Sequence, residues 1–316
     1  MLNRMLTGVV AVCAIGAPAV AQPTAAIVAA STNTANAQAE PRFTDPRDKI
    51  MATGLFGHVD IINATGIGDG TGTPSLATLM QYDAVIVWSN VSFVDSIAMG
   101  DVLADYVDAG GGVVVALFAN TTTTTNRNLA GRWQDPQGGY IAIPQGGGFT
   151  TNTTVSIGEV PDPEHPIMDG VESFINDVGI GTNGPFGAWR PTNTALTAGS
   201  TLVARYTDGK TLIAVAPNPR VVELGFHPVS SAVNDGYWNE TTDGGLIMAN
   251  ALLFAAGLTG SDCVADVNAD GMLSPADFTA WIAAFNAQSP GCDQNGDGSC
   301  TPADFTAWIA NYNTGC

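Results

Sequence analysis

The chain has 316 residues, which is enough for one substantial domain and one small one. It carries 10 Lys and Arg residues against 29 Asp and Glu residues, and this net charge of −19 argues against nucleic acid or anionic membrane surfaces as partners. Charged residues make up only 12% of the chain and glycine occurs 37 times, a composition that suits an exported protein.

The N-terminus has the three parts of a signal peptide. Arg4 supplies the positive charge, residues 5–16 form an apolar run, and Ala19-Val-Ala21 is a small-residue cleavage site. The apolar run is too short to cross a bilayer as a stable helix, and the sequence offers no other candidate membrane span. We therefore predict a signal peptide over residues 1–21, a mature chain from Gln22, and a secreted protein that is extracellular or at the cell surface.

Strand and helix patterns alternate after the signal peptide. Short apolar runs predict strands at residues 25–30, 59–63, 83–88 and 113–118. Helices are predicted over residues 45–55, 75–81 and 96–109. The first helix would be capped by Asp45 with Pro46 in its first turn, and residues 33–43 before it are polar and predict a loop.

The second half of this region has a different pattern. Residues 121–154 are rich in Thr, Asn and Gly, with one short strand predicted at residues 140–143. Three strands joined by turns and a closing helix follow, at residues 201–205, 211–216, 221–226 and 243–256. The alternation predicts an α/β fold with a doubly wound, mostly parallel sheet.

Three stretches of this region are a strand after a helix, a helix-to-strand turn and the segment before the last helix, at Tyr82–Trp88, Asp105–Val115 and Val221–Pro228. Together they resemble the class I glutamine amidotransferase-like domain. The resemblance implies a flavodoxin-like domain over residues 22–258. An active member needs a Cys nucleophile on a tight turn, a His to activate it and a Glu to orient the His.

This chain departs from that catalytic pattern. Phe226-His227-Pro228 is followed by Val229 where the family has Glu, and the elbow at residues 116–120 has neither Cys nor Ser. Every cysteine beyond the signal peptide lies in the C-terminal tail. We therefore assign no catalytic residues and favour a non-catalytic domain.

Two histidines leave an enzymatic alternative open. His165 stands in a predicted turn and His227 follows a predicted strand. We interpret both as groups that hydrogen-bond within loops. Their convergence on a carboxylate in one pocket would instead favour a catalytic His.

The C-terminal residues contain one pattern written twice, starting at Asp266 and at Asp293. A twelve-residue calcium loop supplies oxygen ligands from positions 1, 3, 5, 7, 9 and 12, and has glycine at position 6. Both copies match at every one of these positions. The predicted ligands of two Ca²⁺ ions are Asp266, Asn268, Asp270, Met272, Ser274, Asp277, Asp293, Asn295, Asp297, Ser299, Thr301 and Asp304.

A helix with an apolar stripe is predicted after each loop. The stripe residues recur at i, i+3, i+4 and i+7, and they are Phe278, Trp281, Ile282, Phe285, Phe305, Trp308, Ile309 and Tyr312. Exposed stripes would form a docking patch, whereas stripes that pack only on each other would form a core. No Lys or Arg occurs from residue 262 onward, so we expect the mutually repelling carboxylates to couple calcium binding to folding.

Four cysteines lie in this tail: Cys263, Cys292, Cys300 and Cys316. An even number in a small exported module predicts two disulfides, and the three possible pairings stay open. A zinc site is disfavoured because the tail has no C-x-x-C pair and no His.

The duplicated loop-helix pattern with Asp at position 12 resembles a type I dockerin, and in particular the Gly-Cys-ending dockerin-like tails of some secreted bacterial proteins. The resemblance implies a small all-α, calcium-binding module over residues 259–316 that attaches its protein to a cohesin-like or other cell-surface protein. Departing from the usual pattern, the helices lack basic residues. The predicted function is attachment and display of the amidotransferase-like domain. The alternative is a secreted enzyme of polysaccharide breakdown.

Overall fold

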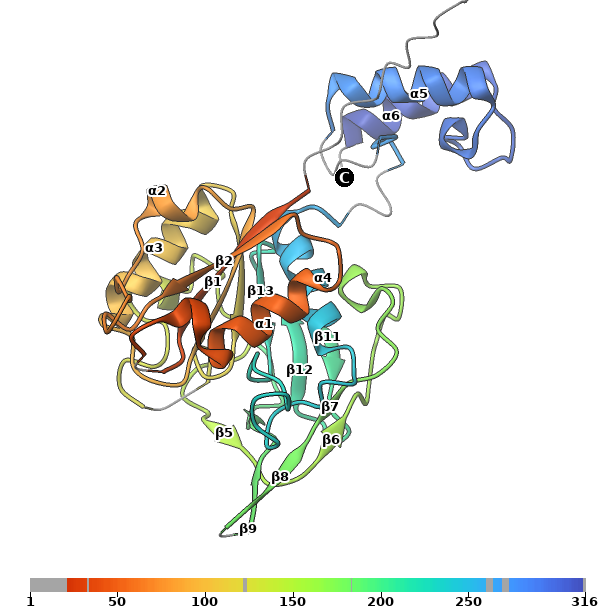
Figure 1. Cartoon of the computed structure of the whole chain (residues 1–316). Helices are drawn as coiled ribbons and strands as arrows, with labels where there is room; N and C mark the ends of the chain where they lie inside the picture. Colours follow the sequence, from red (N-terminus) through yellow and green to blue (C-terminus); the bar gives the residue numbers. More distant parts are fainter. Residues whose placement is uncertain are drawn as a thin grey trace, which may run out of the picture.

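The computed structural model describes residues 22–32, 34–121, 124–182, 184–259, 264–268 and 273–314. The predicted signal peptide lies outside these residues. A seven-stranded sheet with the order β11-β12-β13-β4-β3-β1-β2 forms the centre of the larger body (Figure 1). Its strands are β1 (Thr24–Ala30), β2 (His58–Asn63), β3 (Ala84–Ser89), β4 (Gly112–Ala116), β11 (Thr201–Arg205), β12 (Thr211–Val215) and β13 (Val221–Leu224).

The five strands from β13 to β2 run parallel, whereas β12 and β11 add antiparallel partners at one edge. The predicted α/β class with a mostly parallel sheet is therefore confirmed. Every residue of β3 and β4 is buried, as expected for central parallel strands that are covered on both faces.

Helices cover both faces of the sheet. α1 (Pro41–Met51) and α4 (Gly244–Ala256) pack on one face, while α2 (Leu76–Leu79) and α3 (Ser96–Asp108) pack on the other (Figure 1). Alternate residues of one strand enter different cores: Ile86 belongs to the core that includes residues of α1 and α4, and Val87 to the core that includes residues of α3. No helix in the described ranges is both long enough and apolar enough to cross a membrane.

The first helix begins earlier than predicted. α1 starts at Pro41, has Glu40 as its N-cap and contains Pro46 within it. Asp45 does not cap the helix, because its carboxylate accepts hydrogen bonds from the Ser230 N–H (2.7 Å) and hydroxyl (2.9 Å). The predicted cap instead ties α1 to the loop that follows β13.

The strand predicted at residues 140–143 is wrong. The ring of Tyr140 stacks on Trp133 with a centroid distance of 5.0 Å. The N–H groups of Ala142 and Ile143 donate to the Glu223 carboxylate rather than to a neighbouring strand. A buried side chain therefore replaces the strand partner that the apolar pattern suggests.

Six short strands between β4 and β11 were not predicted. They form three two-stranded sheets, β10-β5, β6-β7 and β8-β9, at one end of the central sheet (Figure 1). Their bounds are β5 (Phe149–Thr150), β6 (Val155–Ser156), β7 (Ile175–Asn176), β8 (Val178–Gly181), β9 (Gly184–Gly187) and β10 (Arg190–Pro191). Short 3-10 helices are η1 (Ala37–Ala39), η2 (Gly131–Gln134), η3 (Pro166–Met168) and η4 (Pro290–Cys292).

The C-terminal residues form two helices, α5 (Pro275–Ala287) and α6 (Pro302–Thr314), which lie side by side in Figure 1. Their apolar core consists of Ala265, Trp281 and Trp308 and is separate from the two cores of the α/β body. Each helix follows one copy of the repeat, as predicted.

Candidate functional site

The second loop of the repeat, residues 293–304, is described throughout and folds around its own acidic side chains. The Asp293 carboxylate accepts hydrogen bonds from the N–H groups of Asp297 (3.1 Å) and Gly298 (2.8 Å). Asn295 bonds to Asp297 through both its amide group and its oxygen. Gly298 adopts a φ of 80° at the position where the loop motif needs a sharp turn. Ligand positions 1, 3 and 5 are thus held in one compact turn.

The last predicted ligand of this loop returns to its beginning. Asp304 is completely buried, and its carboxylate accepts from the N–H groups of Gln294 (3.0 Å), Asn295 (3.3 Å) and Thr301 (2.7 Å). These hydrogen bonds, led by that from Thr301, lower the pKa of Asp304 below its usual value, so the carboxyl is ionised at neutral pH. Position 12 is therefore brought next to positions 2 and 3 of the loop.

The first loop shows the same closure where it is described. Asp277 is completely buried and accepts from the N–H groups of Ser274 (2.8 Å) and Asn268 (3.5 Å). Ser274 and Asp277 also form the capping box of α5. The predicted ligands Asp270 and Met272 lie outside the described residues.

The donor set of the second loop fits a hard cation. It offers carboxylate, amide, hydroxyl and backbone carbonyl oxygens, which are the ligands that calcium prefers. The buried, ionised Asp304 has no Lys or Arg in the tail to balance its charge. Within the described ranges, no group of three or more His, Cys, Asp or Glu side chains is arranged to hold a metal.

Two tryptophans connect the loops to each other. The indole N–H of Trp281 in α5 donates to the carbonyl of Cys292 (3.2 Å), and that of Trp308 in α6 donates to the carbonyl of Ala265 (3.0 Å). Each acceptor directly precedes the first ligand of the loop belonging to the other copy. This exchange was not predicted from the sequence, although a buried indole N–H needs an acceptor and both copies place Trp at the same position.

A disulfide joins Cys292 to Cys300, with their Cα atoms 5.6 Å apart. This selects one of the pairs left open by the sequence. Cys263 and Cys316 lie outside the described residues. The bridge closes the first part of the second loop.

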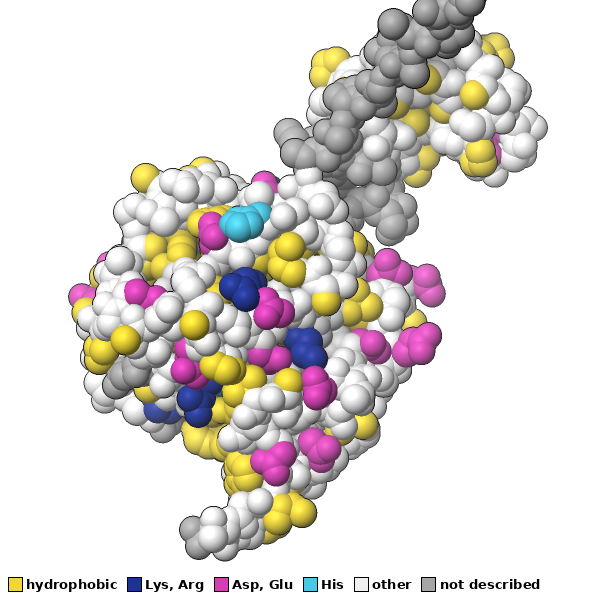
Figure 2. Space-filling model, viewed as in Figure 1, with side chains coloured by type: hydrophobic (Ala, Val, Ile, Leu, Met, Phe, Trp, Pro, Cys, Tyr) yellow, Lys and Arg dark blue, Asp and Glu magenta, His cyan; other side chains and the backbone are white. Residues whose placement is uncertain are grey.

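The apolar stripes divide between core and surface. Trp281 and Trp308 are buried, with Phe285 and Tyr312 packed beside them. Four other stripe residues are 36–42% exposed: Phe278, Ile282, Phe305 and Ile309. We call these four residues the apolar face. The rings of Phe278 and Phe305 lie 5.7 Å apart, so the face is continuous across both helices, and Figure 2 shows hydrophobic side chains on the surface of this module.

The predicted elbow at residues 116–120 and His227 do meet. His227 is buried and its Nδ1–H donates to the carbonyl of Leu117 (3.2 Å) at the elbow. Burial lowers the pKa of His227 to about 4, so the ring is neutral at neutral pH. The rings of Phe118 (5.8 Å) and Tyr237 (4.9 Å) flank it. Among the elbow residues 116–120 there is no nucleophilic side chain for this His to activate.

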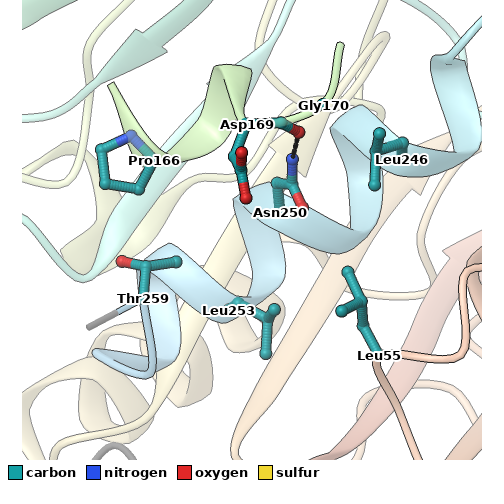
Figure 3. A pocket seen from close by; sticks show the side chains of 8 residues that line it. All are labelled: Leu55, Pro166, Asp169, Gly170, Leu246, Asn250, Leu253 and Thr259. Carbon is teal, nitrogen blue, oxygen red and sulfur yellow. Dashed lines mark hydrogen bonds between the residues drawn. The ribbon is translucent and has the colours of Figure 1, made fainter. Parts of the chain in front are cut away.

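The other two histidines lie elsewhere. His165 accepts a hydrogen bond from the N–H of Ile167 (3.2 Å) and packs on Phe254. The next residue, Pro166, lines a pocket of ≈ 290 Å³ beside α4. Figure 3 shows the residues that line this pocket, which are Leu55, Pro166, Asp169, Gly170, Leu246, Asn250, Leu253 and Thr259. His58 pairs with Asp60 on the surface (2.7 Å). The residues lining this pocket do not include His227, so the convergence that would favour a catalytic His is not observed there.

Glu223, the one charged residue of β13, was not among the predicted site residues. It is buried, and the N–H groups of Ala142 (3.1 Å) and Ile143 (3.2 Å) and the side chain of Asn120 hydrogen-bond to it. Burial raises the pKa of Glu223 to about 8 despite these bonds. The sequence feature that could have pointed to Glu223 is a carboxylate in an otherwise apolar strand.

No family model matches the chain, and no curated protein matches its sequence. Among solved structures, a ThuA-like protein from Bacteroides uniformis is similar, with 17% identity over 77% of this chain and 96% of that one and a TM-score of 0.47. Two proteins from Salmonella typhimurium described as cytoplasmic are also similar. One has 11% identity, coverage of 73% and 98%, and a TM-score of 0.43. The other has 12% identity, coverage of 64% and 87%, and a TM-score of 0.41. The assignment of this chain to the α/β class is based on its own seven-stranded sheet.

Proposed function

We propose that this is an exported calcium-binding protein whose tail attaches it to a cohesin-like or other cell-surface protein and displays a non-catalytic, amidotransferase-like domain. The observation that carries the proposal is the apolar face, formed jointly by the two helices that follow the repeated loops. Calcium would be held by the twelve predicted ligands and would supply the charge balance that the tail lacks. It would thereby fix the two helices that present the face.

Calcium binding is the first expectation to test. Calorimetric titration of the mature protein should show two sites, and the double variant Asp266→Ala plus Asp293→Ala should lose both, because each change removes the first carboxylate of a loop. The variant Asp48→Ala plus Asp169→Ala, in the α/β body, removes the same charge and should bind as the parent does. No binding at millimolar calcium, the weak end for extracellular modules, would contradict the proposal.

Attachment through the apolar face gives the second expectation. The labelled protein should bind the washed cell envelope of its source organism in calcium and be released by a chelator. Exchanging Ile282 and Ile309 for Asp should weaken binding at least tenfold, because charges then replace an apolar contact that is worth about 1.5–3 kcal/mol per side chain. The same variant should still bind calcium. Retention that is unchanged by the chelator or by the Ile substitutions would disprove this route.

The enzymatic alternative stays a prediction. It rests on the association of dockerin-like tails with polysaccharide-degrading enzymes, and no arrangement of the described histidines favours it. Convergence with a carboxylate, the feature that would have supported it, is not observed at the pocket next to His165.

A further inference from the structure

The two loops match at every ligand position, but only the second has one cysteine directly before it and another within it. Cys292 stands immediately before the second loop and Cys300 is its eighth residue. The corresponding residues of the first loop are Ala265 and Leu273, and Leu273 packs against the tryptophan core. Only the second loop can therefore carry this bridge across itself, and the structure shows that it does.

The bridge encloses the first four ligands of the second loop in a covalent ring. Within this ring, the Asp293 carboxylate already accepts two backbone N–H groups, and the Asp297 carboxylate accepts that of Ser299 (2.9 Å). The Trp281 indole holds the carbonyl of Cys292, which fixes one end of the ring to α5. Bridge, carboxylates and indole thus constrain the same short stretch of backbone.

An open loop must lose conformational entropy when its ligands gather around an ion. A disulfide removes part of that entropy before binding, so less of the binding free energy is spent on ordering. Mutual repulsion of the carboxylates opposes the gathering of the ligands in both loops. Only in the second loop does a bridge hold the ligands close together against this repulsion.

We infer that the Cys292–Cys300 disulfide makes the second loop the tighter of the two calcium sites, and that full calcium affinity of the tail requires an oxidised chain. The inference rests on the proposed calcium binding and adds its regulation. Closure of a ring of this size corresponds to an affinity difference of about 10- to 100-fold between the loops. The second loop fills first, and the first loop fills at higher calcium.

Single-loop variants of the full mature chain test the order of filling. Asp266→Ala leaves the second loop, and Asp293→Ala leaves the first. Calorimetry with calcium alone should give a Kd for the Asp266→Ala protein that is about 10- to 100-fold lower than that of the Asp293→Ala protein. Equal affinities, or tighter binding by the first loop, would overturn the inference.

The role of the bridge is tested by adding Cys292→Ser plus Cys300→Ser to each single-loop variant. The affinity of the second loop should fall about 10- to 100-fold, and that of the first loop should change less than threefold. An equal loss in both would show that the bridge acts only on the stability of the module, and would refute a local effect. Near-ultraviolet circular dichroism checks that the module remains folded. If the cysteine variants unfold, the order of filling in the bridged proteins still decides, and no binding by either single-loop variant refutes the calcium proposal itself.

Discussion

Replacing Trp308 with alanine should unfold the C-terminal module while the α/β body stays folded. Trp308 is one of three fully packed residues in a very small core, and its indole N–H donates to Ala265 of the other copy. Removal of a buried Trp costs about 3–5 kcal/mol. A module of this length has only about 3–8 kcal/mol of stability in total, so the loss is comparable to the whole.

Differential scanning calorimetry of the calcium-loaded protein should therefore lose the transition of the module and keep that of the body. Phe305→Ala is the matched control, because Phe305 lies on the same helix but is 38% exposed, and it should lower the stability by only about 1 kcal/mol. Trp308→Phe should fall between the two, since it keeps the ring but loses the indole hydrogen bond. A module that melts normally with Trp308→Ala would show that the tryptophan pair is not its core.

The stability of the α/β body should depend on pH through Glu223. Burial raises its pKa in the folded protein from 4.5 to about 8, so the folded chain holds a proton that the unfolded chain releases. The contribution of protonated Glu223 to the stability of the folded body is therefore complete below pH 4.5 and is lost as the pH rises to about 8. The free energy of unfolding should fall by about 1.4 kcal/mol per pH unit over that interval.

Glu223→Gln should remove this dependence, because the amide does not titrate. Urea unfolding of the parent and the variant at several pH values measures the difference, in which the contributions of other titrating groups cancel. Glu164→Gln, an exposed position, should follow the parent. A variant whose curve runs parallel to the parent between pH 5 and pH 8 would mean that Glu223 is already ionised in the folded protein.

The sequence predicted the parts of the fold that have a clear local pattern of apolar residues. The apolar runs at β1, β3 and β4 are buried on both faces, so their composition alone identified them. α1 was misplaced because Asp45 before Pro46 looks like a helix cap, whereas its partner is Ser230, far along the chain. The strands β5 to β10 are too short to show a period, and tertiary contacts determine them.

The candidate site divides in the same way. Ligand spacing is a local property, so the sequence predicts the calcium ligands residue by residue from Asp266 and Asp293 onward, and this assignment stays a prediction. The exchange of indole hydrogen bonds depends on how the two copies pack. The pairing of Cys292 with Cys300 depends on the three-dimensional fold of the second loop. The position of His227 at an elbow without a nucleophile could be predicted only because the neighbouring segments resemble a known domain.

The exchanged indole bonds define the smallest unit that can fold. A single copy of the repeat would place its tryptophan N–H in an apolar core without an acceptor, because that acceptor belongs to the other copy. One copy of the repeat alone therefore lacks the hydrogen-bond acceptor that its buried tryptophan needs. A fragment ending before Cys292 would be completed only by a second molecule, so truncation of this tail should create dimers rather than a smaller monomer.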